Sequence, residues 1–288
     1  MRKDTHPLIQ LLVLLFLMLA MLLVTGMFTF IVGLVNGSAG MALDSTSKLL
    51  WVQSITQVMT FIVPVLLIGL IYYRGGQQQF FRLYFGGSKW LLGLAGIVVM
   101  LLLTPLNEWL TEWNAQWNLG QLGETMHRLQ EQTEGIMEKM LETTTVGGLL
   151  ANLVVVALIP AVSEELFFRG GIQNILQKWL KNPHIVVWLT AVIFSLGHGE
   201  IFSFMPRLVM GATLGYLYIC SGSILPNMLA HFANNAIIVV LYWLNARGDL
   251  AVDPEAPIDF GWILTACCTL AAIVLFIVTF VKKQKTSE

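Results

Sequence analysis

Long apolar runs separated by short polar segments dominate the chain, and this pattern predicts helices that cross a membrane. A bilayer span needs about 20 predominantly apolar residues. We therefore expect an all-α polytopic membrane protein, a bundle of about eight transmembrane helices that forms one integral membrane domain over residues 1–288. The predicted spans are 8–35, 49–73, 89–106, 146–170 (continuing as a helix to 180), 183–198, 205–221, 224–245 and 261–281.

The positive charges of the predicted loops fall mainly on one side of the membrane. Cytoplasmic loops carry an excess of Lys and Arg. The segregation therefore favours an even number of spans, with both termini in the cytoplasm. The cation-rich side holds Arg2, Lys3, Arg74, Arg82, Lys89, Lys178, Lys181, Lys282, Lys283 and Lys285, and the other side holds Lys48, Arg128, Lys139 and Arg247.

Composition agrees with a membrane protein and excludes several other classes. Hydrophobic residues make up 56% of the chain, charged residues 11%, and the mean hydropathy is +0.74. A soluble domain carries about a quarter charged residues. Disorder, a disulfide-stapled secreted domain and a nucleic-acid-binding surface are excluded, so no nucleic-acid partner is expected. Cys220, Cys267 and Cys268 lie in apolar stretches and are interpreted as small core residues.

Two further segments need separate interpretation. The first apolar run exceeds the 7–15 residues that a cleaved signal peptide would have, so we expect it to be retained as a span. Residues 107–145 form the one long connection, predicted to be extracytoplasmic and amphipathic. Trp109, Trp113 and Trp117 recur every four residues there, which places them on one helical face. The segment is expected to lie on the outer leaflet, or alternatively to cap a substrate entrance.

Ionisable groups inside the predicted spans are few, and each costs about 2.5–3.5 kcal/mol to insert, which makes them functional candidates. Glu165 and Arg169 are four residues apart, so they share a helix face and are expected to pair. Glu164 is rotated by about 100° from Glu165 and has no local partner. Pro160, four residues earlier, is expected to kink this helix. The other ionisable groups are His198, Arg207 and His231.

The two histidines lie in distinctive local contexts. Glycines flank His198, which predicts that the helix breaks there. His231 and Asn235 are four residues apart and share a face. Glu164, His198 and His231 lie at estimated depths of ~24, ~21 and ~12 Å from the cytoplasmic ends of their spans, so the three can meet inside the membrane.

This inventory of a carboxylate, two histidines and an amide suits activation of a water molecule and stabilisation of an oxyanion. It also allows a zinc site built from Glu164, His198 and His231. A buried histidine can instead be an ordinary hydrogen-bonded core residue, and a Glu–Arg pair can simply clamp two helices together. The chain has no HExxH motif, and the three candidate ligands come from different helices, which favours a site without tightly bound metal.

Three short motifs occur in order on separate predicted spans: EExxxR at 164–169, FxxxH at 194–198 and HxxxN at 231–235. Together they resemble the signature of the CPBP family, the CAAX proteases and bacteriocin-processing enzymes, also called Abi proteins. The resemblance covers residues 146–245, which it marks as the catalytic core. It implies an eight-helix intramembrane endopeptidase. By this resemblance Glu164 and His198 would activate water, His231 and Asn235 would stabilise the oxyanion, and Glu165 and Arg169 would support the site.

The resemblance also implies partners and a location. The substrate would be a membrane-associated protein or peptide, the surroundings membrane lipid, and the location the inner (plasma) membrane of a bacterium. Both a metal-dependent and a metal-free mechanism are associated with the family, so zinc stays an open possibility. Two other functions stay open as well: a proton-coupled transporter that uses the same groups as a proton relay, and a non-catalytic, immunity-type membrane protein.

Overall fold

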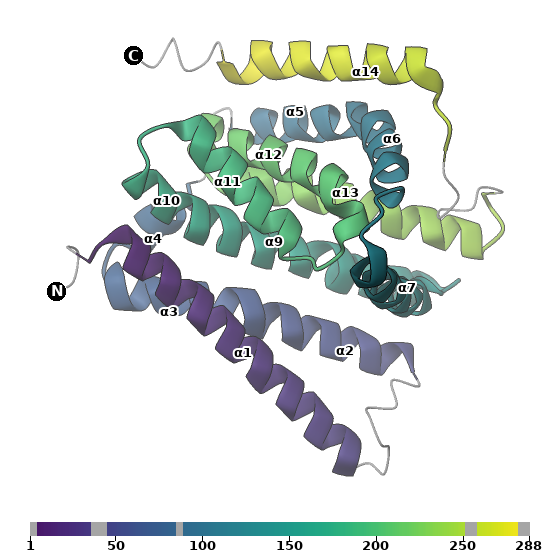
Figure 1. The fold of residues 1–288 in the computed structure, drawn as a ribbon, viewed down its shortest axis with the longest axis horizontal. Helices are drawn as coiled ribbons and strands as arrows, with labels where there is room; N and C mark the ends of the chain where they lie inside the picture. Colours follow the sequence, from purple (N-terminus) through teal and green to yellow (C-terminus); the bar gives the residue numbers. More distant parts are fainter. Residues whose placement is uncertain (1–4, 36–44, 85–88, 251–257, 282–288) are drawn as a thin grey trace.

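The computed structural model describes residues 5–35, 45–84, 89–250 and 258–281, and within them every regular element is a helix (Figure 1). The all-α prediction is confirmed. The predicted cations Arg2, Lys3, Lys282, Lys283 and Lys285 lie outside the described residues. The α-helices are α1 (Pro7–Val35), α2 (Thr46–Gln57), α3 (Val63–Tyr72), α4 (Gln77–Phe81), α5 (Lys89–Leu102), α6 (Thr104–Ala115), α7 (Gly120–Leu141), α8 (Val146–Asn152), α9 (Ile159–Glu165), α10 (Asn174–Trp179), α11 (Pro183–Leu196), α12 (Phe204–Ser221), α13 (Leu225–Ala246) and α14 (Gly261–Phe276).

Several continuous helices are long and apolar enough to cross a membrane, so the chain is a polytopic helical membrane protein. Within the described residues five pass this test: Pro7–Val32, Thr46–Tyr72, Val146–Trp179, Leu225–Ala246 and Gly261–Thr279. Helices α5 and α6, bent by 48° at their junction, would make a sixth if they form one span.

The count of five or six is lower than the predicted count of about eight. Helix α11, which we expected to span, has only 14 residues. At 1.5 Å per residue it is about 21 Å long, shorter than the hydrocarbon core. Helix α12 carries Arg207 in its first turns, and it is also not among the helices that are long and apolar enough to cross a membrane.

The ends of the helices sort into two groups (Figure 1). The start of α1, the short helix α4 and the turn between α10 and α11 lie at the left of the view. Helices α6 and α7 lie at the right. The alternation of loops across a membrane stays a prediction from the sequence pattern.

Four apolar clusters are found among the described residues, and the two with the most buried residues hold most of the helices together. One joins α1, α3, α4, α10, α11 and the π-helical segment Leu166–Gln173, and contains buried residues such as Leu14, Ile68 and Phe167. The other joins α5, α12, α13 and α14, around Leu214 and Leu217. Helix α14 packs mainly on α5 and α6 and exposes most of its surface. Cys267 is exposed on this helix, so its interpretation as a core residue was wrong: α14 presents that face outward.

Two π-helical turns interrupt the long helix that carries both glutamates. They are Leu153–Leu158 and Leu166–Gln173, and α9 with Glu164 and Glu165 lies between them. Pro160 lies two residues after the end of the first π-helical turn, and the helix continues through it. Such turns inside α-helices are frequent at functional sites, because they change which side chains face inward.

Helices α11 and α12 pack closely because of two glycines. A Cβ atom on Gly211 would lie 3.1 Å from Cδ1 of Phe194, and one on Gly215 would lie 2.9 Å from Cγ1 of Val187. The close helix packing expected of a GxxxG pair is therefore present.

The predicted amphipathic segment forms α6 and α7, which cover the loop after α11. Asn114 donates to the carbonyl of Ile201 at 3.0 Å, and the rings of His127 and Phe202 stack at 3.6 Å. Leu122, Leu129 and Ile136 of α7 are exposed. The segment thus combines an apolar outer face with contacts to the loop that follows His198.

Candidate active site

The predicted pair of Glu165 and Arg169 is present and completely buried. Nη1 of Arg169 donates to Oε1 of Glu165 at 2.7 Å, and both side chains are 0% exposed. Nη2 of the same guanidinium donates to the backbone carbonyl of Gly211 at 2.9 Å. One turn further along, Gln173 donates to the carbonyl of Gly215 at 2.9 Å. Glycine at both positions lets these side chains reach the backbone of α12.

Glu165 has a second partner on a distant helix. Nδ1 of His231, on α13, lies 2.9 Å from Oε1 of Glu165, the oxygen that also accepts from Arg169. His231 is 2% exposed. One carboxylate therefore joins an arginine of its own helix to a histidine 66 residues away.

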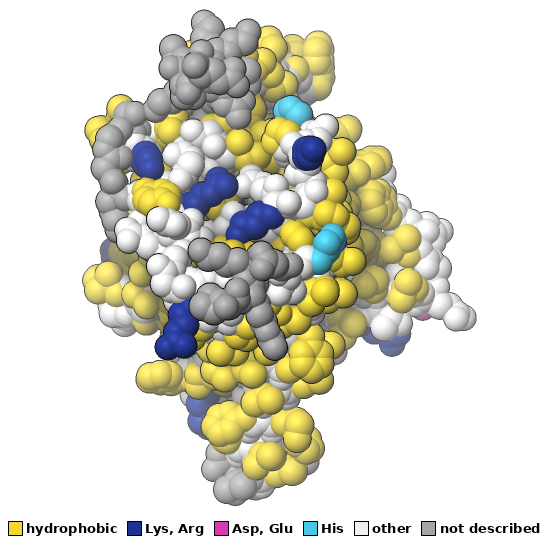
Figure 2. Space-filling model, turned by 90° about the vertical axis from the view of Figure 1, so that its left-hand side faces the viewer, with side chains coloured by type: hydrophobic (Ala, Val, Ile, Leu, Met, Phe, Trp, Pro, Cys, Tyr) yellow, Lys and Arg dark blue, Asp and Glu magenta, His cyan; other side chains and the backbone are white. Residues whose placement is uncertain are grey.

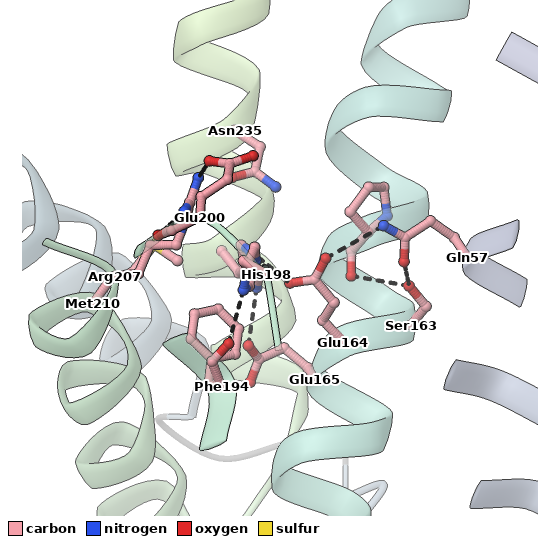
Figure 3. Close-up of polar contacts among 12 residues, drawn as sticks. Gln57, Ser163, Glu164, Glu165, Phe194, His198, Glu200, Arg207, Met210 and Asn235 are labelled. Carbon is pink, nitrogen blue, oxygen red and sulfur yellow. Dashed lines mark hydrogen bonds and ion pairs between the residues drawn. The ribbon is translucent and has the colours of Figure 1, made fainter. Parts of the chain in front are cut away.

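Glu164 points to a different set of groups, as its rotation from Glu165 predicted. Its Oε2 lies 3.7 Å from Nε2 of His198 and 3.9 Å from Nε2 of His231. Its Oε1 accepts a hydrogen bond from Gln57 at 3.4 Å, and Gln57 in turn accepts one from Ser163 at 3.1 Å. Figure 3 shows the Glu164 carboxylate between Gln57 and His198.

Hydrogen bonding fixes which nitrogen of His198 faces the glutamate. Helix α11 ends at Leu196, and Gly199 adopts a φ of +73°, so the predicted helix break is confirmed. Nδ1 of His198 lies 2.8 Å from the carbonyl oxygen of Phe194. Because a carbonyl can only accept, Nδ1 carries the proton, and the neutral ring keeps its lone pair on Nε2, towards Glu164.

The ring of Phe194 contacts three groups of the site. The guanidinium of Arg169 lies 4.8 Å from the ring centroid, and the ring of His198 packs edge-on at 4.7 Å. The ring of His231 lies 6.2 Å away, also edge-on. A phenylalanine at this position therefore fills the space between the cation and both imidazoles.

Asn235 lies one turn beyond His231 on α13 and is half-buried. Its Oδ1 accepts from Nδ2 of Asn234 at 3.4 Å. Figure 3 shows Asn235 beside Glu200 and Arg207, which form an ion pair next to the site. The structure thus places Asn235 at the side of the cluster, near polar groups that follow the α11 helix break.

Gln57 and Glu200 were not predicted as site residues from the sequence. Gln57 is one of several polar residues in α2, and its contact with Glu164 joins positions 107 residues apart. Glu200 follows the histidine motif by two residues and lies on a loop, where no helical spacing indicates its partner. The available signal for Gln57 was its place as a polar side chain near the middle of the apolar span Thr46–Tyr72.

The possible zinc site was tested against this geometry. Among the described residues no group of three or more His, Cys, Asp or Glu side chains is placed to hold a metal ion. A zinc site built from Glu164, His198 and His231 stays a prediction from the sequence. We derive no chemical step through a metal.

The site is most accessible from the His198 side. The side chain of His198 is 26% exposed, whereas those of Glu164, His231 and Glu165 are 8%, 3% and 0% exposed. The buried network of Glu165 and Arg169 therefore lies behind the two groups that a substrate would meet first.

Comparison with known proteins identifies a family for the part of the chain that contains this site. Residues 146–237 match the family described as "Type II CAAX prenyl endopeptidase Rce1-like". These residues form an Rce1-like domain. The Rce1-like family consists of CAAX prenyl endopeptidases, which are peptidases, so the resemblance indicated by the three motifs is confirmed. The Rce1-like domain contains the buried cluster of Glu164, Glu165 and His231. No curated protein and no solved structure matches the chain.

Proposed function

We propose that this protein is an intramembrane endopeptidase that hydrolyses a peptide bond of a membrane-associated protein or peptide. The observation that carries the proposal is the approach of Oε2 of Glu164 to Nε2 of His198, 3.7 Å apart at the accessible edge of a buried polar cluster. Neither group donates a proton to the other in this state, so both can accept hydrogen bonds from one water molecule.

The 3.7 Å separation suits a shared water. An oxygen about 2.8 Å from each acceptor completes a triangle on this base. Its two protons then point to the carboxylate of Glu164 and to the lone pair of His198. Removal of one proton by this pair turns the water into the nucleophile that attacks the substrate carbonyl.

His231 and Asn235 are proposed to stabilise the oxyanion that forms on the attacked carbonyl. Nδ1 of His231 lies 2.9 Å from the carboxylate of Glu165, which can only accept a hydrogen bond, so Nδ1 is the donor. The imidazolium form also presents an N–H at Nε2, on the side of Glu164. Asn235 uses its oxygen in its hydrogen bond with Asn234, which leaves its amide N–H groups to donate.

Glu165 and Arg169 are proposed to act as positioning residues. Glu165 holds the ring of His231, while Arg169 holds Glu165 and is itself anchored on the carbonyl of Gly211. This chain of contacts fixes the direction of His231 without reaching the substrate. Residues 146–245 would then be the catalytic core, within one membrane domain that includes the rest of the chain.

The orientation belongs to the same proposal. We place both termini in the cytoplasm and the protein in the plasma membrane of a bacterium, because the Lys and Arg of the loops gather on the side of the termini. The segment 107–145 then lies on the outer side. Its contacts with the loop after His198 put it next to the accessible edge of the site.

The proposal is tested with purified full-length protein in detergent and a library of membrane-associated and prenylated peptides. Mass spectrometry is expected to find defined cleavage products with the wild type and none with Glu164→Ala. Absence of cleavage together with proton flux in reconstituted liposomes would support the transporter instead. Absence of both activities would support a non-catalytic protein.

A further inference from the structure

A cavity of about 750 Å³ opens at the end of the bundle where α1 begins and α3 and α10 end. It is separate from the candidate active site and shares no residue with it. Figure 2 shows this face of the molecule, on which Lys and Arg side chains gather. Arg74, Arg82 and Lys178 line the cavity, and we call it the basic cavity.

Lys178 is held in place by aromatic rings. Its Nζ lies 3.8 Å from the ring centroid of Tyr73 and 4.9 Å from that of Phe80. The two rings stack on each other at 4.0 Å with an interplanar angle of 12°. Gln10 of α1 hydrogen-bonds the hydroxyl of Tyr73, which ties this wall to the first helix. The ammonium group is therefore oriented before any ligand arrives.

Arg82 lines the same cavity and has an unusual backbone conformation. With a φ of 50° it is the one non-glycine residue of positive φ in the described part of the chain. Glycine or asparagine would adopt this conformation more easily than arginine. A strained backbone at a non-glycine residue suggests that its side chain has a function. Nη2 donates to Gln177 at 2.8 Å, and the guanidinium has further N–H groups to offer.

The positive charge of the basic cavity is not balanced by the described residues that line it. No Asp or Glu is among the described lining residues. Arg74 makes no hydrogen bond or ion pair with any residue of the described ranges and is exposed. Three like charges around one cavity repel each other, and an anion bound between them would remove that repulsion. Phosphate is a suitable anion, because guanidinium groups bind its oxygens in pairs.

The position of the basic cavity indicates where such an anion would come from. Its walls are the ends of three helices that can span a membrane: Pro7–Val32, Thr46–Tyr72 and Val146–Trp179. The cavity therefore lies at the level of the membrane surface. Exposed apolar side chains continue from it along the outer faces of the helices. They are Ile9 and Leu12 on α1 and Leu70 and Ile71 on α3.

We propose that the basic cavity binds the phosphate group of an anionic phospholipid, whose acyl chains lie along α1 and α3. Basic pockets between helices at a membrane surface recognise phospholipid headgroups by this combination of charge and apolar surface. A soluble phosphate compound offers the same anion without the chains. The inference does not depend on the proposed peptidase activity.

Lipid titration of the purified full-length protein in neutral detergent tests the proposal. Phosphatidylglycerol is compared with phosphatidylcholine and with glycerol phosphate, and affinity is read from intrinsic fluorescence or native mass spectrometry. The variant is Arg74→Gln with Lys178→Gln. Its control, Lys89→Gln with Lys181→Gln, removes two cations of the same predicted loop side that do not line the basic cavity.

Phosphatidylglycerol is expected to bind at least tenfold more tightly than the other two probes. The cavity variant should lose about tenfold in affinity for it, and the control variant less than twofold. Equal loss in both variants, or equal affinity for phosphatidylcholine, would overturn the proposal. Glycerol phosphate binding as tightly as the lipid would overturn the lipid assignment. If the double variant does not fold, the exposed Arg74→Gln alone should weaken binding several-fold, and no change would overturn the site.

Discussion

Nδ1 of His231 lies 2.9 Å from Oε1 of Glu165, inside a region where the Glu165 side chain has no exposed surface. The same oxygen accepts from Arg169 at 2.7 Å. One oxygen of Glu165 thus contacts both a cation on its own helix and a histidine on α13. The two adjacent glutamates have different nearest partners, since Oε2 of Glu164 lies closest to Nε2 of His198, at 3.7 Å, and 3.9 Å from Nε2 of His231.

Glu165→Ala is expected to lower both stability and activity. The substitution leaves the buried guanidinium of Arg169 without its carboxylate, and breaking a buried pair costs roughly 3–5 kcal/mol. Thermal unfolding in detergent should show a clear decrease in Tm. Glu131→Ala, on the exposed surface of α7, is the matched control and should leave the Tm unchanged. Lost activity with an unchanged Tm would make Glu165 a catalytic residue rather than a positioning one.

His198→Ala is expected to abolish peptide hydrolysis while the protein stays folded. The side chain is 26% exposed, and its recorded hydrogen bond is to the carbonyl of Phe194, so little packing is lost. His184→Ala, at the other end of α11, removes an imidazole that hydrogen-bonds Tyr216 and should keep activity. Rates and melting curves are measured for both variants. Cleavage by His198→Ala at the wild-type rate would remove this histidine from water activation.

Gly211→Ala is expected to destabilise the protein by about 1–3 kcal/mol, because overpacking shifts neighbouring atoms. The added Cβ would lie 3.1 Å from Cδ1 of Phe194 and 3.2 Å from Cα of Ala191. Gly135→Ala in α7 is the control, since its Cβ would meet nothing within 4 Å. Alanine there should stabilise the helix slightly. Chemical or thermal unfolding of both variants checks the prediction, and equal stability of the two would contradict the close packing of α11 and α12.

Hydrolysis is expected to survive exhaustive chelation. The groups nearest to the expected water position act as acceptors of its protons, and the described residues form no three-ligand metal group. Elemental analysis of active protein should find far less than one zinc per chain. Near one zinc per chain, with activity lost on chelation and restored by added zinc, would contradict this prediction.

Contacts between residues close together in the sequence could be predicted, whereas contacts between residues far apart in the sequence could not. The pairing of Glu165 with Arg169 follows from helical periodicity alone, and the break at His198 follows from its two glycines. The contacts of Glu165 with His231 and of Glu164 with Gln57 depend on how separate helices are placed. No local pattern determines that placement.

The number of helices that cross the membrane also could not be predicted from apolar runs alone. Apolar runs located α11 and α12 correctly as helices, but not whether each is long enough to cross a bilayer. The apolar run of 89–106 contains a bend of 48° between α5 and α6, at Thr104 and Pro105, which hydropathy does not reveal. The π-helical turns around α9 also could not be predicted from the sequence, because no residue type requires them.

The proposed function depends on activation of water by the Glu164 carboxylate for peptide hydrolysis. The most direct measurement is the cleavage rate of one defined peptide by wild type, Glu164→Gln and the surface control Glu131→Gln, with melting curves for all three. Glutamine keeps the shape and the hydrogen bond with Gln57 but cannot accept a proton from water. We expect a loss of at least about 100-fold in cleavage rate for Glu164→Gln with an unchanged Tm, and wild-type activity for the control. A Glu164→Gln protein that cleaves the peptide at the wild-type rate would contradict the proposed role of Glu164.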